Sequence, residues 1–423
     1  MKPEILRLYA VTDRTWLGGK SLAWQVEQAI KGGATCVQLR EKGKAKEEII
    51  NSAREVKAVC NKYGVPLIIN DSPELAALCD ADGVHIGQGD GSVAEARRII
   101  GKDRILGVSA RTIDAARKAE AEGADYIGTG AAFQTSTKGD AEVITTDRIR
   151  EITGGVRIPV TAIGGINENN LMRLKGTGIS GAAIVSGIFA QEDIEAACRR
   201  LRKMTDSLKY KITGAIFDLD GTLFDSMHIW EELAVSYIVR KGLVSKPNLY
   251  ENVKTMSFED AARYLKSEYK ISETQEDMEG ELKLVLSELY NKSAELKTGV
   301  AEFLKYLKEQ GVKICIATAS DGEITERILK KYDVLKYIDK IFTCNEYGHK
   351  DGPEIYNAAL EYMETDLENT WVFEDAAYCI RTAKNAGFNV CAVWDKYETD
   401  VYFVKENSDL YLETFERAEI YFD

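Results

Sequence analysis

Two aspartates, two positions apart, form the strongest chemical signal in the sequence. Asp218 and Asp220 come directly after the apolar stretch Gly214–Phe217 and are followed by a glycine and a threonine. This spacing places Asp218 at the tip of a buried strand and Asp220 in the following turn. One carboxylate can then attack phosphorus while the other gives and takes protons. Two acids in a turn are common by themselves, but this string after an apolar strand favours phosphoryl chemistry.

Three later segments supply the other groups that such chemistry needs. Thr318 ends an apolar stretch with a hydroxyl, and Lys350 precedes a predicted helix. Glu374 and Asp375 end another apolar stretch with two carboxylates. Together with the first aspartates, these oxygens suit a hard cation such as Mg²⁺.

A different set of polar residues marks the first half of the chain. Gln38, Arg40 and Lys42 alternate with other residues, so on a strand their side chains share one face. Two cations beside an amide suit a diphosphate joined to a hydrogen-bonding heterocycle. Taken alone, the motif also fits a solvated strand end.

Carboxylates and hydroxyls follow other strands of this half. Asn70 and Asp71 end one predicted strand, Asp90 lies in the loop after the next, and Ser109 ends a further one. Two carboxylates from neighbouring loops can hold Mg²⁺ beside substrate phosphates, although turn chemistry explains each aspartate alone. Hydroxyls and an ammonium that could wrap a phosphate follow the sixth strand, and small residues follow the seventh and eighth. These residues are Thr135, Ser136, Thr137, Lys138, Gly164, Gly165, Val185 and Ser186.

Eight short apolar runs alternate with stretches of helical spacing over residues 1–205, which predicts a (βα)8 TIM barrel. The polar residues above fall where its strands end, at the face where such barrels bind ligands. The predicted strands are Leu8–Thr12, Cys36–Leu39, Pro66–Ile69, Gly83–Ile86, Ile105–Val108, Tyr126–Gly128, Pro159–Ile163 and Gly181–Val185.

A short linker over residues 206–211 leads to a second predicted domain, residues 212–423. Its pattern predicts a doubly wound, Rossmann-like α/β fold in which a helical cap, at about 227–297, interrupts the sheet. The predicted strands are Ile212–Phe217, Ile314–Ala317, Lys340–Thr343, Trp371–Phe373 and Val390–Val393.

Composition narrows the functional classes. The 423 residues carry a formal charge of −13, which argues against a general nucleic-acid binder. The eight cysteines form no CxxC pair and fit reduced, buried thiols, and three histidines rule out a histidine-rich metal site. The N-terminus does not have the pattern of a signal peptide, and no apolar run approaches about 20 residues. We therefore expect a cytoplasmic enzyme with no membrane or nucleic-acid partner.

Residues of about 5–203 resemble thiamine phosphate synthase. The resemblance rests on the motifs around Gln38, Asn70, His85, Ser109 and Thr135, with Gly164-Gly165-Ile166. It implies that a hydroxymethylpyrimidine diphosphate is joined to a thiazole phosphate through a dissociative reaction that releases pyrophosphate. Arg111 and Ala131 depart from the family pattern, where histidine and proline are usual.

The resemblance also implies a role for each group. The pyrimidine diphosphate would be held by Gln38, Arg40, Lys42, Asn70, Ser109 and Lys138, the last being catalytic. Mg²⁺ would be held by Asp71 and Asp90. The thiazole phosphate would be held by Thr135, Ser136, Thr137, Gly165, Val185 and Ser186.

Residues of about 211–423 resemble the haloacid dehalogenase-like hydrolases, which implies a phosphatase or mutase that uses Mg²⁺. Asp218 would be the nucleophile that forms an aspartyl phosphate, and Asp220 the general acid and base. Thr318 and Lys350 would bind the phosphoryl group. Mg²⁺ would be held by Asp218, the backbone carbonyl of Asp220, Glu374 and Asp375.

Fusion of the two halves suggests reactions in series, because the first product is a phosphomonoester and the second half hydrolyses such esters. We therefore predict that the second domain converts thiamine phosphate to thiamine. Its substrate could instead be a pyrimidine, thiazole or sugar phosphate or a damaged metabolite, and the barrel could be a thiazole-isomerising relative or a silent binding module. The synthase family's habit and the apolar helix faces lead us to expect self-association.

Overall fold

The computed structural model describes residues 1–135, 142–253 and 258–423. The described residues divide into two compact units. The first comprises Met1–Tyr210 with Ile420–Phe422, and the second comprises Lys211–Glu419 with Asp423. Each unit is described by itself below.

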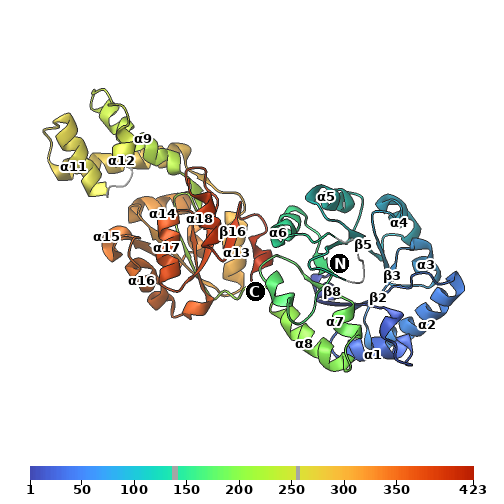
Figure 1. The fold of residues 1–423 in the computed structure, drawn as a ribbon. Helices are drawn as coiled ribbons and strands as arrows, with labels where there is room; N and C mark the ends of the chain where they lie inside the picture. The colour runs from blue at the N-terminus through green and yellow to red at the C-terminus, as the bar shows by residue number, and fades with distance from the viewer. Residues whose placement is uncertain (136–141, 254–257) are drawn as a thin grey trace. The chain divides into compact units, whose positions relative to one another are not determined.

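The first unit is a closed barrel of eight parallel strands (Figure 1), as predicted. The first and last strands close it, with Tyr9 in register with Ala183. Inward side chains such as Tyr9, Ile68 and Tyr126 fill the interior. The strands are β1 (Leu8–Val11), β2 (Cys36–Leu39), β3 (Leu67–Asn70), β4 (Gly83–Ile86), β5 (Ile105–Ser109), β6 (Tyr126–Thr129), β7 (Val160–Ile163) and β8 (Gly181–Ile184).

Helices cover the outside of this barrel, with apolar residues such as Ala53, Val56 and Cys60 facing the strands. The α-helices are α1 (Leu22–Lys31), α2 (Lys46–Tyr63), α3 (Pro73–Leu78), α4 (Val93–Ile100), α5 (Ile113–Ala121), α6 (Thr146–Gly155), α7 (Ser186–Phe189) and α8 (Ile194–Asp206). The predicted alternation holds with one difference after β7, where the described chain forms the short 3-10 helix η3 (Leu171–Leu174) in place of an α-helix. Gly176 and Gly178 follow with left-handed backbone angles, which end the helix after one turn.

The second unit is built on a six-stranded sheet in the order β13-β12-β9-β14-β15-β16. The chain adds strands on one side of β9 and then on the other, so the order reverses between β9 and β14. Ligands of such sheets bind beyond the carboxyl ends of the strands at this reversal. The strands are β9 (Gly214–Phe217), β12 (Lys313–Thr318), β13 (Lys340–Thr343), β14 (Thr370–Glu374), β15 (Asn389–Val393) and β16 (Leu410–Leu412).

Three short strands of this unit were not predicted. Edge strand β16 has three residues, and β10 (Phe224–Asp225) and β11 (Glu295–Leu296) have two each and pair with one another. Segments of this length carry too few residues to show a period. The β10–β11 pair marks where the cap leaves the core and returns to it.

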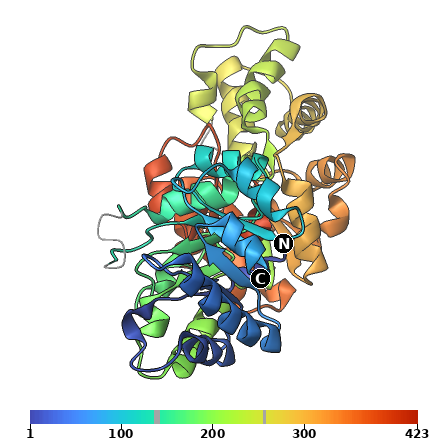
Figure 2. The same cartoon turned by 90° about the vertical axis from the view of Figure 1, so that its right-hand side faces the viewer.

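Helices flank the sheet, and four more form the cap. The flanking helices are α13 (Val300–Glu309), α14 (Gly322–Lys331), α15 (Cys344–Tyr347), α16 (Glu354–Met363), α17 (Ala377–Asn385) and α18 (Val401–Glu406). The cap helices are α9 (Met227–Arg240), α10 (Leu249–Val253), α11 (Phe258–Tyr269) and α12 (Gln275–Ser293), and they stand apart from the sheet in Figures 1 and 2. Within the described ranges, the helices are all too short or too polar to cross a membrane.

Candidate active sites

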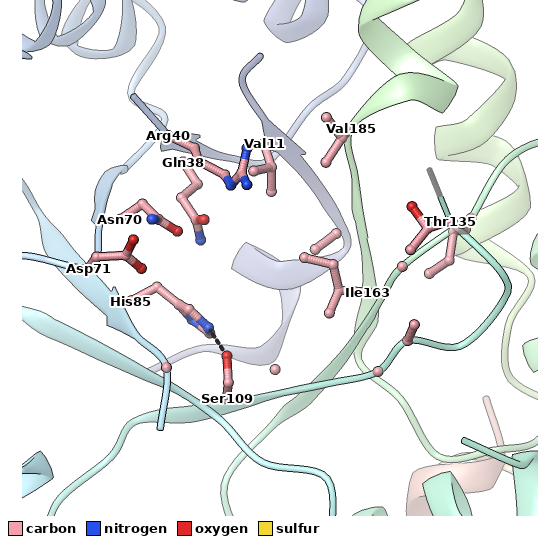
Figure 3. Close-up of a pocket in the computed structure, with 18 of the residues that line it drawn as sticks. Val11, Gln38, Arg40, Asn70, Asp71, His85, Ser109, Thr135, Ile163 and Val185 are labelled. Atoms are coloured by element: carbon pink, nitrogen blue, oxygen red, sulfur yellow. Dashed lines mark hydrogen bonds between the residues drawn. The ribbon is translucent and has the colours of Figure 1, made fainter. Parts of the chain in front are cut away.

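The first unit has a pocket of about 570 Å³ at the carboxyl ends of its barrel strands (Figure 3). Its lining brings together most of the residues predicted for this half. These are Gln38, Arg40, Lys42, Asn70, Asp71, Asp90, Ser109, Thr135, Gly164, Gly165, Val185 and Ser186. Three further predicted residues, Ser136, Thr137 and Lys138, lie outside the described part of the chain.

Charged groups of both signs meet at the mouth of this pocket. Arg40 Nη1 lies 3.7 Å from Asp13 Oδ2, and Lys42 Nζ lies 3.7 Å from Asp71 Oδ2. Lys42 is more than half exposed, so its ion pair is weak and the ammonium can turn to an incoming anion. Asp90 accepts a 2.8 Å hydrogen bond from the backbone nitrogen of Gly87, which holds its loop. The pocket thus offers cations for a diphosphate and carboxylates for a counter-cation.

Several lining residues have no predicted role. His85 lies on β4 and forms a hydrogen bond with the Ser109 side chain. Gln88 Nε2 donates to the backbone carbonyl of Ser109 at 2.6 Å. Arg111 and Ala131, the two departures from the family pattern, both line the pocket. Arg111 donates to the backbone carbonyl of Glu142, so its guanidinium is held at the pocket wall. Two signals could have placed His85: it belongs to one of the motifs that carry the resemblance, and it lies on β4 facing the pocket.

The second unit gathers its predicted groups at the carboxyl edge of the sheet. Asp218 follows β9, Thr318 ends β12, Glu374 ends β14 and Lys350 lies just before α16. All four side chains are buried. Lys350 donates to Asp218 and, at 2.7 Å, to Glu374 Oε1.

Burial dominates the electrostatics of this cluster. It raises the pKa of Asp218, and it raises the pKa of Asp375 well above its ordinary value, with Glu374 adding to both shifts. Burial by itself would lower the pKa of Lys350, but Asp218 and Glu374 outweigh it and hold that pKa well above its ordinary value. Lys350 therefore contacts two of the three buried acids, Asp218 and Glu374.

The carboxylates fit a divalent cation. Asp218, Glu374 and Asp375 each offer an oxygen, and these atoms lie within 4.8 Å of one another. Thr222 Oγ1 donates to Asp375 Oδ1 at 2.9 Å and fixes its direction. Gly221 has a φ of +87°, and a Cβ there would lie 2.3 Å from Asp375 Oδ2, so only glycine lets the turn approach this closely. A hard cation with oxygen ligands would offset the excess negative charge.

The Asp220 side chain points to hydroxyls and lies outside the acidic cluster. Ser320 Oγ donates to Asp220 Oδ2 at 2.7 Å, while Ser226 and Tyr290 both donate to Oδ1. Tyr290 belongs to cap helix α12, so a cap residue helps to orient this carboxylate. Sequence reasoning missed all three hydroxyls, because they lie 6, 70 and 100 residues from Asp220 along the chain.

Lys297, which sequence reasoning also did not identify, holds the turn that carries Asp220. Lys297 donates to the carbonyl of Gly221 and, at 2.6 Å, to that of Trp394. Its ammonium also lies 3.1 Å from the buried carboxylate of Asp395. This lysine follows β11, so it ties the cap's point of return to the catalytic turn.

Two family models match the chain, one in each unit. Residues 8–188 match thiamine monophosphate synthase, and residues 215–393 match the haloacid dehalogenase-like hydrolases. The thiamine-phosphate synthase of Clostridium tetani is 50% identical over 194 residues, which cover 46% of this chain and 93% of that protein. The thiamine-phosphate synthase of Ruminiclostridium cellulolyticum is 50% identical over 202 residues, 48% of this chain and 96% of that protein.

A solved structure, thiamine phosphate pyrophosphorylase from Pyrococcus furiosus, is 34% identical and covers 49% of this chain and 98% of its own, with a TM-score of 0.46. The sequence matches carry the assignment of the first unit, and the second family model carries that of the second. The chain therefore belongs to the thiamine-phosphate synthase family and joins to that enzyme a haloacid dehalogenase-like hydrolase domain.

Proposed function

We propose that the chain makes thiamine phosphate in its barrel and hydrolyses it to thiamine in its second domain. The observation that supports the first step is the barrel pocket, whose lining gathers three amides, three cations, two carboxylates and several hydroxyls. The support for the second is the buried set of Asp218, Lys350, Glu374 and Asp375, with Asp220 beside it. The domains form one chain, and the product of the first reaction is an ester of the class that the second hydrolyses.

In the barrel, the bond between the pyrimidine methylene carbon and the diphosphate oxygen breaks, and pyrophosphate leaves with the bonding electrons. The thiazole nitrogen then donates its lone pair to the resulting carbocation, so no protein nucleophile is needed. Arg40 and Lys42 would stabilise the charge on the leaving group, and Gln38 and Ser109 would orient the ring. Asp71 and Asp90 would hold Mg²⁺, which supplies further positive charge to the diphosphate when bound.

In the second domain, an Asp218 oxygen would attack phosphorus while Asp220 protonates the departing alcohol oxygen. Asp220 would then take a proton from the water that hydrolyses the aspartyl phosphate, which restores both carboxyl groups. Thr318 and Lys350 would hold the phosphoryl oxygens. Mg²⁺ would be held by Asp218, the carbonyl of Asp220, Glu374 and Asp375, and would neutralise phosphoryl charge when bound.

The proposal places this chemistry in the cytoplasm, with small molecules as substrates. The boundaries at 1–205, 206–211 and 212–423, the cap at 227–297 and self-association remain predictions.

One incubation tests the proposal. The purified protein is mixed with the pyrimidine diphosphate, the thiazole phosphate and Mg²⁺, and the products are separated over time. We expect thiamine phosphate to appear first and free thiamine to follow. With Asp218→Asn, thiamine phosphate should accumulate at the wild-type rate without conversion.

Two results would overturn parts of the proposal. Absence of thiamine phosphate would overturn the synthase assignment. Accumulation of thiamine phosphate by the wild type, with turnover no faster than for generic esters, would overturn the link between the domains. A panel of pyrimidine, thiazole and sugar phosphates would then identify the ester that the second domain prefers.

A further inference from the structure

A continuous chain of hydrogen bonds crosses the interior of the barrel and connects two sides of the pocket. Gln38 Nε2 donates to the Tyr9 hydroxyl at 2.8 Å, and the hydroxyls of Tyr9 and Tyr126 lie 2.9 Å apart. His85 places Nδ1 2.9 Å from the Tyr126 hydroxyl and Nε2 2.9 Å from Ser109 Oγ. Gln38, His85 and Ser109 line the pocket (Figure 3), whereas the two tyrosines lie in the core beneath it.

The residues around this hydrogen-bonded chain bury it and leave space for it. Tyr9 is 1% exposed and Tyr126 is fully buried, so their hydroxyls depend on protein partners. A Cβ at Gly107 would lie 2.3 Å from the Tyr126 hydroxyl oxygen, and one at Gly128 would lie 2.8 Å from His85 Cε1. Glycines on β5 and β6 therefore provide the space in which the tyrosine and the imidazole meet.

The chemistry of the members gives the chain a direction. Each tyrosine hydroxyl has one hydrogen, and a neutral imidazole has one N–H, so every internal member donates once and accepts once. With Gln38 donating into the chain, Tyr9 donates to Tyr126, Tyr126 to His85, and His85 to Ser109. Gln38 then keeps its amide oxygen for a ligand, and Ser109 keeps its hydrogen. If every hydrogen bond in the chain reverses, Gln38 offers its amide N–H to a ligand and Ser109 offers a lone pair, so the two ends change together.

We propose that Tyr9, Tyr126 and His85 are positioning residues that tie the amide of Gln38 to the hydroxyl of Ser109. Because the two residues are linked in this way, the pocket favours a heterocycle that presents a hydrogen-bond donor to Gln38 and, at the same time, an acceptor to Ser109. A ligand with acceptors at both points meets a lone pair at one end in either direction, and a ligand with donors at both points leaves the Ser109 hydrogen without a partner when Gln38 donates into the chain. This inference rests on the proposed function, because the pyrimidine diphosphate of that reaction is an aminopyrimidine. Its exocyclic amine is a donor, and the ring nitrogen beside the amine is an acceptor.

The test compares binding of two ligands to the full chain with Mg²⁺ and without thiazole phosphate. One is the pyrimidine diphosphate, and the other is its analogue with hydrogen in place of the exocyclic amine. We expect the wild type to prefer the amine by about tenfold, the range of one hydrogen bond whose partner is otherwise left unpaired.

The decisive variant is Tyr126→Phe, because Tyr126 lies in the middle of the hydrogen-bonded chain and the substitution leaves Gln38 and Ser109, its two ends, unchanged. It removes the acceptor of the Tyr9 hydrogen, so Tyr9 is released to donate to the Gln38 oxygen or to Cys36, and the amide is no longer held with its oxygen toward the ligand. We expect the preference for the amine to fall to about twofold or less. Tyr9→Phe, which releases Gln38 directly, should reduce the preference to a similar extent.

The matched control is Tyr63→Phe, which removes a surface hydroxyl that donates to Glu27 in the same unit. It should keep the wild-type preference. If Tyr126→Phe binds both diphosphates more weakly by the same factor, or keeps the wild-type preference, the inference is overturned. If Tyr126→Phe does not fold, Tyr9→Phe decides by the same criterion. Failure of the wild type to bind either diphosphate would instead overturn the proposed function.

Discussion

The ammonium of Lys350 and the carboxylate of Glu374 lie 2.7 Å apart, and both side chains are almost fully buried. Asp218 shares the same ammonium. Removing one partner of a buried ion pair leaves an uncompensated charge, which costs about 3–5 kcal/mol. We therefore expect Lys350→Met to lower the free energy of unfolding of the second domain by about 3 kcal/mol and to abolish phosphatase activity.

Denaturant unfolding of the full chain measures this loss, and Lys305→Met provides the control. Lys305 pairs with Glu309 at 3.8 Å on the surface, where both side chains are 61% exposed. Such a pair contributes little, so its loss should leave stability close to the wild type. Equal effects of the two substitutions would contradict the view that burial makes the Lys350 cluster important.

Tyr290 offers a test of how the cap takes part in catalysis. Tyr290→Phe removes one of three hydroxyls that hold Asp220, so the carboxylate should spend less time in its productive orientation. We expect the phosphatase kcat to fall about tenfold while KM changes little, because the group acts on proton transfer. The control is Tyr264→Phe, also in the cap, which removes a hydroxyl that accepts a 3.2 Å hydrogen bond from Asn252. It should leave both constants unchanged.

Asp71 allows the barrel to be disabled without disturbing its backbone. It has a φ of +71°, which asparagine also tolerates, so Asp71→Asn should preserve the turn while removing the charge. We expect synthase activity to fall at least about 100-fold and phosphatase activity to persist. Asp80→Asn, which also has a positive φ and lies on the surface, should leave both activities intact. A parallel loss of both activities in Asp71→Asn would show that the sites are not independent.

The cysteines predict a simple pattern of chemical labelling. Burial raises the pKa of Cys60, Cys198 and Cys315 to about 12, so almost no reactive thiolate forms at pH 8. Burial also raises the pKa of Cys79, but Cys79 is the half-buried cysteine among the eight, all of which are free, so a reagent can reach it. Native protein at pH 8 should therefore take up one alkyl group first, at Cys79, and the rest only after unfolding. Mass spectrometry identifies the site, and early labelling of Cys60 would contradict the prediction.

The sequence predicts those parts of the fold and sites whose signals are local. Asp218, Glu374 and Asp375 each follow an apolar run, and parallel strands bring such positions to one edge of a sheet. The same reasoning places Gln38 and Ser109 around the barrel mouth, where the structure brings them together.

Residues whose roles depend on distant partners escape this reasoning. Tyr290 looks like an ordinary core residue of a helix until the fold brings it to Asp220. Tyr9 and Tyr126 sit on buried strands 117 positions apart, and only barrel closure places their hydroxyls together. Strand β16 was missed for a different reason, since three residues cannot display a period.

The β10–β11 pair has a consequence for how this protein can change over evolutionary time. The segment between the two strands leaves and re-enters the core at adjacent, hydrogen-bonded points, Phe224 opposite Leu296 and Asp225 opposite Glu295. An insertion with neighbouring ends can be lengthened, shortened or exchanged at little cost to its host. Most of the cap can therefore diverge to suit a new ester while the carboxylates that break the bond are inherited unaltered, with Tyr290 as the point where a replacement must still meet Asp220.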